Sequence, residues 1–259
     1  MNGASPSGAP LTVPIPWQEL FLLAEEKEQT GKLADADRLL NHILAVTPQQ
    51  PDAVHLSGIV AFRLGRHQEA LAKVEQAISL AIDPGLYLRN VCEIYRVMGR
   101  LDEAVAAARR AIELRPNDPI CLHNLAVVHN ERQEPEQSIA CAESALLMSP
   151  DLAGAHFALA EALLMLGRME RGWEEYEWRF RIPNGRSSMP AIGRPDWDGS
   201  AFSDARLLLV ADQGFGDAIQ FCRYIPWAMQ RCPDIVVACS AEMIPVLRQF
   251  VPECRIFQR

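Results

Sequence analysis

The chain lacks the features that mark several large protein classes. No run among its 259 residues approaches the roughly 20 consecutive apolar residues that a membrane-spanning helix needs. The first 16 residues, MNGASPSGAPLTVPIP, have neither a basic start nor an apolar centre, so they predict a disordered leader rather than a signal peptide. The seven cysteines, an odd number without paired spacing, favour a reducing compartment over a disulfide framework. We therefore expect a cytoplasmic protein with no membrane span.

Motifs of the common enzyme chemistries are also missing. The six histidines are dispersed, and none joins a cysteine or an acidic residue at the spacing of a metal site. No serine lies in a nucleophile elbow, and no G-x-x-x-x-G-K-[ST] loop is present. These absences argue against metal-dependent, hydrolase and nucleoside-triphosphatase functions, and we predict no metal and no cofactor for the chain as it stands.

Charge of both signs is present but unevenly placed. Residues 1–182 carry 17 basic and 25 acidic side chains, whereas residues 183–259 carry eight of each. Nonspecific nucleic-acid binding needs a basic surface that neutralises phosphates. The acidic balance therefore argues against a nucleic-acid partner and favours a peptide or protein partner.

A pattern of small and apolar residues recurs every 34 residues. Copies begin near residues 17, 51, 85, 119 and 153, the first and last being weaker than the three between them. In this spacing and composition the pattern resembles the tetratricopeptide repeat, a pair of antiparallel helices. In the third copy it comprises Leu88, Val91, Cys92, Tyr95, Gly99, Ala104, Ala108, Ala111 and Pro116.

Each part of this pattern has a packing reason. Small side chains let two helix axes approach closely, glycine tolerates the turn between the helices, and proline cannot continue a helix. At least about three repeats are needed for a stable stack. We therefore predict a mainly α fold: a solenoid of about five helical hairpins over residues 17–182, followed by a different, smaller domain.

In such arrays the first helix of each pair lines a concave groove. Asn90 and Asn124 fall there one period apart, which resembles the asparagine ladder of O-linked N-acetylglucosamine transferase, since a side-chain amide both donates and accepts hydrogen bonds. The alternative is that these are solvated polar residues on a helix face. The repeat phase places the following residues in the groove: His55, Ile59, Phe62, Arg89, Asn90, Glu93, Arg96, His123, Asn124 and Asn130.

The last hairpin ends in RMERGWEEYEWRFRI, where aromatic residues crowd behind Gly172. A terminal repeat normally presents a polar capping face. We interpret the aromatics as core covered by the part of the chain that follows.

Residues 183–205 are rich in Pro, Gly, Ser and Asp and predict a linker, which we expect Trp197 to dock onto a neighbouring surface. The pattern then changes. Residues 206–211, 234–239 and 254–257 predict short buried strands, and GDAIQFCRYIPWAMQRC and AEMIPVLRQFV predict helices. The order βαβαβ over residues 206–259 is typical of a partial, Rossmann-like half domain.

The loop QGFGD joins the first of these strands to the first helix. Gly214 and Gly216 allow the backbone to approach a ligand at the carboxyl end of the strand, where ligands of such sheets bind. A tight turn without a ligand is the alternative, because G-x-G-D lacks the third glycine of the dinucleotide fingerprint.

PDWDG at 195–199, the strand, and DQGFGDAIQFCRYIP together resemble bacterial proteins in which tetratricopeptide repeats precede a GT-B glycosyltransferase domain of the heptosyltransferase-like class. Asp212 and Phe215 depart from the usual glutamate and leucine. The resemblance implies that Asp217 acts as a general base on an acceptor hydroxyl; a helix cap is the alternative role. It also implies that the loop region contacts acceptor or donor through Gln213, Gly214, Phe215, Gly216, Gln220 and Arg223.

A complete GT-B enzyme has two Rossmann domains, and residues 206–259 supply only the front of the first one. We therefore expect no sugar transfer by this chain alone; a nucleotide-sugar donor would be needed only if the domain were completed. Two functions stay open. One is an acceptor-recognition module, for a protein or glycan, joined to a glycosyltransferase. The other is a non-enzymatic adaptor whose groove binds a peptide and whose half-sheet caps the array. A bare sheet edge also favours self-association.

Overall fold

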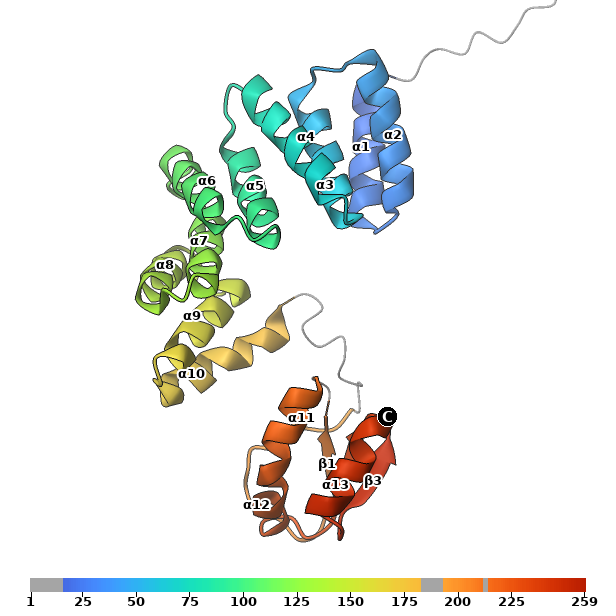
Figure 1. The fold of residues 1–259 in the computed structure, drawn as a ribbon, viewed down its shortest axis with the longest axis vertical. Coiled ribbons are helices and arrows are strands. Elements are labelled where there is room, and N and C mark those ends of the chain that lie inside the picture. The colour runs from blue at the N-terminus through green and yellow to red at the C-terminus, as the bar shows by residue number, and fades with distance from the viewer. Residues whose placement is uncertain (1–15, 183–192, 212–213) are drawn as a thin grey trace, which may run out of the picture. The chain divides into compact units, whose positions relative to one another are not determined.

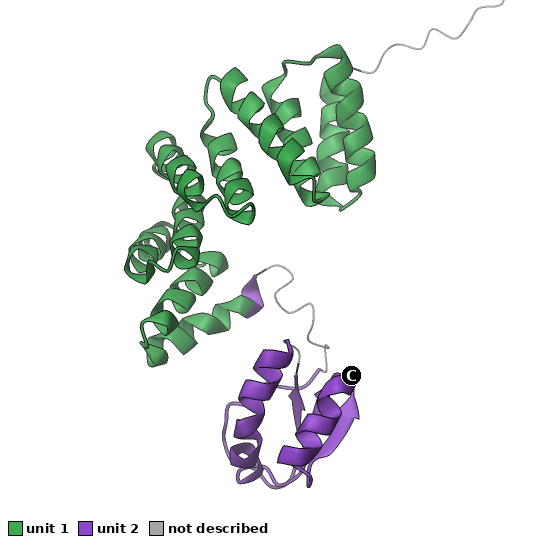
Figure 2. Cartoon of the chain, viewed as in Figure 1, with its two compact units in different colours: residues 1–179 green, residues 180–259 purple. Residues whose placement is uncertain are grey.

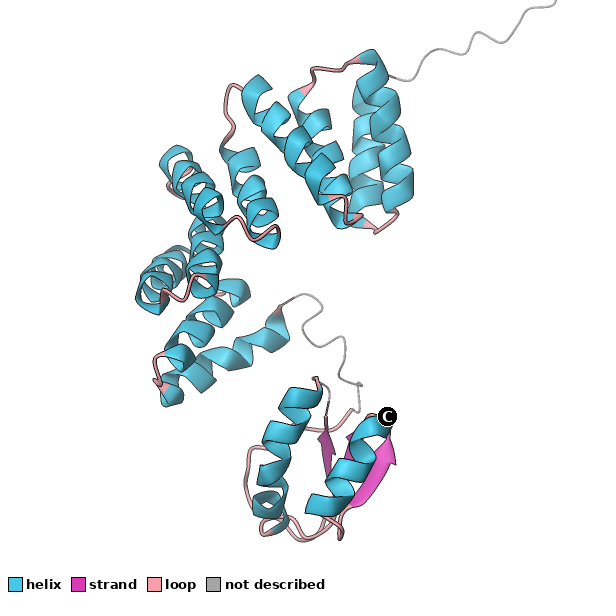
Figure 3. Ribbon diagram, viewed as in Figure 1, coloured by secondary structure: helices cyan, strands magenta, loops and turns pink. Residues whose placement is uncertain are grey.

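The structure, a computed structural model, describes residues 16–182, 193–211 and 214–259 (Figure 1). The chain divides into two compact units, residues 1–179 and 180–259 (Figure 2). The first unit is helical, and the second combines short helices with a small sheet (Figure 3).

The first unit is a solenoid of five helical hairpins, as the 34-residue period predicts. The first helices of the hairpins begin at Trp17, Pro51, Gly85, Pro119 and Ala153, each 34 residues after the one before. The helices are α1 (Trp17–Gln29), α2 (Leu33–Val46), α3 (Pro51–Arg63), α4 (His67–Leu80), α5 (Gly85–Val97), α6 (Leu101–Leu114), α7 (Pro119–Glu131), α8 (Pro135–Met148), α9 (Ala153–Met165) and α10 (Met169–Tyr176), followed by the 3-10 turn η1 (Glu177–Arg181).

A residue with positive φ makes the turn inside every hairpin. Four of the five turns use glycine, with φ between 71° at Gly167 and 79° at Gly65. The fourth turn places Gln133 there, at φ 60°. Glycine reaches this left-handed region without a Cβ penalty, whereas a side chain pays a steric cost. The expected role of the turn glycine is therefore confirmed, and Gln133 is its exception.

Small residues allow the two helices of a hairpin to cross closely. A Cβ on Gly58 would lie 2.6 Å from Cγ2 of Val74, and one on Gly172 would lie 2.8 Å from Cδ2 of Leu164. Ala36, Ala70, Ala104, Ala142 and Ala158 are likewise buried. The core of the array is therefore built around alanine and glycine, with larger aliphatic side chains filling the space between hairpins.

Aromatic residues at the end of the array pack against its own last hairpin. The ring of Trp178 stacks on His156 of α9, with centroids 3.7 Å apart, and Tyr176 lies 5.4 Å from Phe157. Trp173 is 46% exposed. These two ring contacts lie on α9. That the aromatics are also covered by the following domain stays a prediction.

The second unit contains a three-stranded parallel sheet in the order β1-β2-β3. The strands β1 (Leu207–Val210), β2 (Ile235–Cys239) and β3 (Arg255–Gln258) alternate with helices, so the predicted βαβαβ order is observed. In the register, Leu207 pairs with Ile235, and Val236 pairs with Arg255. The intervening elements are α11 (Phe215–Phe221), η2 (Cys222–Tyr224), α12 (Ile225–Met229), η3 (Ala241–Met243) and α13 (Ile244–Phe250).

Both predicted helices of this unit are interrupted where a proline follows a 3-10 turn. Pro226 has no N–H to donate to the carbonyl of Cys222, and that carbonyl instead accepts from the N–H of Ile225. Pro245 has the same effect, because the carbonyl of Ala241 accepts from Ile244. The prediction of continuous helices was therefore wrong: the first consists of α11, η2 and α12 in succession, and the second consists of η3 followed by α13.

The core of the second unit lies between the sheet and these helices. Ile235, Val237 and Cys239 alternate along β2 and pack against Cys222 and Leu247 of the covering elements. The opposite face of the sheet bears Leu208, 39% exposed, and Phe257, 55% exposed. None of the described helices is long and apolar enough to cross a bilayer.

Candidate functional site

The first helices α1, α3, α5, α7 and α9 contact one another in succession and form one continuous surface of the array. Polar side chains on this surface connect neighbouring repeats at a separation of 35 residues, one more than the period. We call these contacts the inter-repeat ladder. Its pairs are Glu28 with Arg63, Asp52 with Tyr87, His55 with Asn90, Arg89 with Asn124, and Arg96 with Glu131.

His55 is a buried rung of the inter-repeat ladder. Its Nε2 lies 3.0 Å from Nδ2 of Asn90, and its ring stacks on Tyr87 with centroids 4.3 Å apart. An amide NH₂ only donates, so Nε2 accepts and the proton lies on Nδ1. Burial lowers the pKa of His55 to about 4, so the ring is neutral at physiological pH.

Asn90 and Asn124, the two predicted rungs of an asparagine ladder, use their amide nitrogens inside the array. Nδ2 of Asn90 donates to His55, and Nδ2 of Asn124 donates to the carbonyl oxygen of Arg89 at 3.2 Å. Within the described residues, neither Oδ1 has a hydrogen-bond partner. Each Oδ1 is therefore an acceptor open to a ligand in the groove, and each amide nitrogen, which has two N–H groups, uses one of them inside the array.

The arginines of the predicted groove are already paired. Arg89 contacts Asp118 at 2.9 Å, and Arg96 holds both oxygens of Glu93 while also contacting Glu131 of the next repeat. One guanidinium thus lies between two carboxylates, and this group of three side chains carries a net charge of minus one. The groove therefore presents no uncompensated cation at either arginine.

At the far end of the groove, Asn130 lies deeper than the sequence predicts. It is 8% exposed, and its Nδ2 donates to the carbonyl oxygen of Ala158 at 2.8 Å and lies 3.4 Å from Oε2 of Glu161. Its Oδ1 is buried without a partner among the described residues. Burial raises the pKa of the Glu161 carboxyl, because the charged form loses solvation.

The remaining predicted groove residues contribute packing. Ile59 and Phe62 are half-buried against the core of the array, and Phe62 also lies 5.3 Å from the ring of His67. His123 packs against Gly154 of the next repeat, where a Cβ would lie 2.9 Å from its ring. Burial lowers the pKa of His123, and its Nδ1 has no partner within the described residues.

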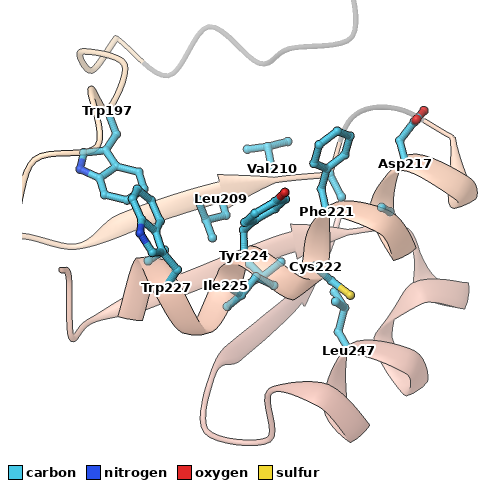
Figure 4. Close-up of a pocket in the computed structure, with 14 residues that line it drawn as sticks. Trp197, Leu209, Val210, Asp217, Phe221, Cys222, Tyr224, Ile225, Trp227 and Leu247 are labelled. Atoms are coloured by element: carbon cyan, nitrogen blue, oxygen red, sulfur yellow. The ribbon is translucent and has the colours of Figure 1, made fainter. Parts of the chain in front are cut away.

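A second candidate site is an apolar cavity of about 380 Å³ in the α/β unit (Figure 4). It lies beside the carboxyl end of β1, and Asp217 is the one charged residue among the described residues that line it. In Figure 4, Trp197 and Trp227 are at one end of the cavity and Asp217 is at the other. The lining comprises Trp197, Leu209, Val210, Ala211, Asp217, Ala218, Phe221, Cys222, Tyr224, Ile225, Trp227, Ala228, Val237 and Leu247.

Of the predicted loop residues that the structure describes, Asp217 alone lines this cavity. Gly214 precedes α11, and Phe215, Gly216 and Gln220 are exposed on its first turns. Arg223 is also exposed, with its guanidinium over the ring of Tyr224. Gln213 lies outside the described residues. The N-cap residue of α11 is Gly214, which has no side chain to cap the helix, and Asp217 is the acidic residue of the first turn.

The aromatic lining of the cavity was not predicted as a site. Phe221, Tyr224 and Trp227 recur every third residue, and this spacing is the signal that the sequence offered. Trp197 behaves as expected, since its ring packs 5.6 Å from that of Trp227 and its Nε1 donates to the carbonyl of Ser200. The segment before β1 is thereby anchored to α12.

Comparison with known families supports the assignment of the helical unit. A model described as tetratricopeptide repeat matches residues 21–86 and 123–177, and a second model with that description matches residues 93–118. Together these segments span more than half of the chain. The chain is a tetratricopeptide-repeat protein. The matches concern the repeats, so the resemblance of residues 195–226 to glycosyltransferases remains a hypothesis.

One curated relative is the protein FlbA of Caulobacter vibrioides. It is 31% identical to this tetratricopeptide-repeat protein over 109 residues, which is 41% of the present chain and 18% of FlbA. The chain therefore spans less than a fifth of that relative's length.

Solved structures share the fold. Pseudomonas aeruginosa PilF aligns with a TM-score of 0.58 at 18% identity, covering 64% of this chain and 76% of PilF. TTC0263, a tetratricopeptide-repeat protein of Thermus thermophilus, aligns with a TM-score of 0.56 at 20% identity, covering 68% and 93%. MamA aligns with a TM-score of 0.53 at 16% identity, covering 61% and 93%. At these identities the likeness establishes the solenoid fold alone.

Proposed function

We propose that the repeat array over residues 17–182 binds an extended segment of a partner protein along the surface of α1, α3, α5, α7 and α9. The observation that carries this proposal is the state of Asn90 and Asn124. Their amide nitrogens are held by the inter-repeat ladder, which orients each Oδ1 without a partner in the described residues. Backbone N–H groups of an extended peptide are the matching donors.

The proposal requires little rearrangement of the array. Side chains fixed by hydrogen bonds lose less conformational entropy on binding than mobile ones do. Apolar groups that remain exposed on the same helices, Val97, Ile120 and Met165, provide area that a peptide side chain can cover. The polar and apolar groups that would contact an extended peptide are therefore in place before it binds.

An array of immobilised linear peptides tests this function, with the purified chain as the probe. Replacing Asn124 by Leu keeps the side-chain size and removes the acceptor; we expect about a tenfold loss of binding, the equivalent of roughly 1.4 kcal/mol. Gln76→Leu, on the second helix of its hairpin, is the matched control. If Asn124→Leu and Gln76→Leu lose the same amount of peptide binding, a groove on the first helices is contradicted. It is also contradicted if neither variant changes peptide binding.

The role proposed for the α/β unit, residues 206–259, is that of a Rossmann-like half domain attached through the segment 183–205. The position of Asp217 at the mouth of an apolar cavity, beside the carboxyl end of β1, favours a sugar or nucleotide-sugar ligand there. With Asp217 as general base, such a site would serve a glycosyltransferase whose acceptor is a protein or glycan.

The adaptor function and the transferase function differ in a measurable way. In the adaptor proposal, these 259 residues bind a peptide and transfer no sugar from any nucleotide donor. Release of nucleotide from UDP-, GDP- and ADP-sugars in the presence of bound peptide is the measurement. Turnover that Asp217→Asn abolishes without changing the melting temperature would support the transferase; no turnover supports the adaptor.

A further inference from the structure

The ninth position of the first helices alternates in character along the array. Successive repeats place Glu25, Ile59, Glu93, Val127 and Glu161 there, so a carboxylate and a branched aliphatic side chain follow one another every 34 residues. Because the first helices contact one another in order, this alternation runs along the proposed groove.

Each of the three acidic positions is a centre of net negative charge. Glu25 and Glu161 have no cationic partner within the described residues. Glu93 shares the guanidinium of Arg96 with Glu131, and these three side chains carry a net charge of minus one. Within the described residues Arg63 is paired with Glu28, so neither Arg63 nor Arg96 is a free cation for these carboxylates.

The last of these centres has an additional unmet acceptor. Oδ1 of Asn130, a side chain only 8% exposed, is buried without a hydrogen-bond partner in the described part of the chain, and the amide nitrogen of the same side chain lies 3.4 Å from Glu161. Buried polar atoms are normally satisfied, so an orphaned acceptor beside a carboxylate indicates a missing donor. An ammonium group provides several donors and the opposite charge.

The distance between ninth positions on neighbouring first helices matches the spacing of side chains along an extended peptide. Helices in contact lie about 8–10 Å apart, and an extended chain rises about 3.3 Å per residue. One repeat therefore corresponds to roughly three peptide residues. Successive repeats meet side chains three residues apart in the ligand.

From this geometry we infer that the groove selects an extended peptide in which lysine or arginine alternates with an aliphatic residue at every third position. The inference rests on the proposed peptide-binding function and adds the chemistry of the ligand. Lysine or arginine side chains lie against Glu25, the Glu93–Arg96–Glu131 group and Glu161, and the aliphatic side chains lie against Ile59 and Val127.

Fluorescence anisotropy with three labelled peptides tests the inference. The probe is KSGLSGKSGLSGK, the charge reversal is ESGLSGESGLSGE, and the spacing control, with the same composition as the probe, is KKKLLSGSGSGSG. We expect the probe to bind about tenfold more tightly than either of the others, and this advantage to shrink as salt is added. Equal affinity for the lysine and glutamate peptides would overturn the inference, and so would equal affinity for the probe and its spacing control.

Charge-removing variants locate the effect. Glu161→Gln and Glu25→Gln should each weaken probe binding about threefold, whereas Glu113→Gln, on the second helix of its hairpin, should leave it unchanged. A loss that Glu113→Gln reproduces would show a general charge effect and overturn the inference. If arrayed peptides bind the groove without preference for lysine or arginine, the inference fails and the proposed function stands. If no arrayed peptide binds, the proposed function itself fails.

Discussion

Nδ2 of Asn90 donates a hydrogen bond to Nε2 of His55 across the boundary between the second and third repeats. The bond requires an imidazole that is neutral, because a protonated ring has no acceptor to offer. Protonation of His55 would therefore break a contact between repeats as well as place a charge in a buried position.

Acid should destabilise the array through His55. Its pKa falls from an ordinary 6.5 to about 4 in the folded chain, mainly through burial. The unfolded state therefore binds the proton more readily, and the contribution of His55 to stability, complete above pH 6.5, is lost as the pH falls toward 4. Between about pH 8 and pH 5 we expect a loss of about 2 kcal/mol from this group.

Urea unfolding of the wild-type chain and of His55→Gln at both pH values measures this effect. Glutamine does not titrate, so the variant should lose about 2 kcal/mol less than the wild type on acidification. Identical losses would show that His55 is not the titrating group.

Gln133 should be replaceable by glycine with a gain in stability. It takes the positive φ that glycine takes in the other four hairpin turns. Removing the Cβ relieves the left-handed strain, and we expect Gln133→Gly to stabilise the chain by about 0.5–1 kcal/mol. Thermal unfolding is the measurement.

The reverse exchange, Gly99→Gln, serves as the control. A Cβ on Gly99 would meet nothing within 4 Å, so the cost there is conformational. It should destabilise the chain by a comparable amount. Two changes of the same sign would contradict the assignment of strain to φ.

Gly58 should not tolerate a methyl group. A Cβ there would meet Cγ2 of Val74 at 2.6 Å and the carbonyl oxygen of Ala70 at 3.2 Å. Overpacking of this kind costs about 1–3 kcal/mol, more than alanine gains in helix propensity over glycine. Chemical denaturation of Gly58→Ala should therefore show a net loss of about 1–2 kcal/mol.

A double-mutant cycle with Val74→Ala isolates the clash. Because Val74→Ala removes the methyl group in conflict, the double variant should be more stable than the sum of the two single losses predicts. If the stability losses of the two single variants simply add, the cost of Gly58→Ala does not come from the contact with Val74.

Binding of the lysine peptide should weaken in acid. Burial raises the pKa of Glu161, and the nearby charges are those of Glu131 and Arg96. As the pH falls through this raised pKa, the carboxylate is neutralised and its attraction for an ammonium group is lost. Anisotropy titrations at decreasing pH should show this decline in the wild type and a shallower one in Glu161→Gln.

The sequence alone was sufficient to predict the helical unit. Each first helix begins where the period places it, and the turn residues Gly31, Gly65, Gly99 and Gly167 have the expected positive φ. These features are local or strictly periodic, so the order of residues determines them. The prolines at 226 and 245 are also local, and their effect on the two short helices was available from the sequence but not used.

The chemistry of the groove could be predicted only in part. Alignment on a 34-residue period brings Asn90 onto Asn124, but the bonds of both residues run to partners 35 residues away. Which amide atoms are already occupied depends on that offset, which comes from the stagger between neighbouring helices. The lining of the cavity depends likewise on how α11 and α12 pack on β1, and periodicity does not specify this packing.

The inter-repeat ladder has a mechanical consequence. Each of its bonds joins a residue of one repeat to a residue of the next, so the bonds act in parallel with the apolar contacts against any change in the pitch of the superhelix. Stretching or compressing the array would have to break several of them together. The distance from one recognition position to the next is therefore fixed before a ligand binds. The array then discriminates between extended peptides by the spacing of their side chains.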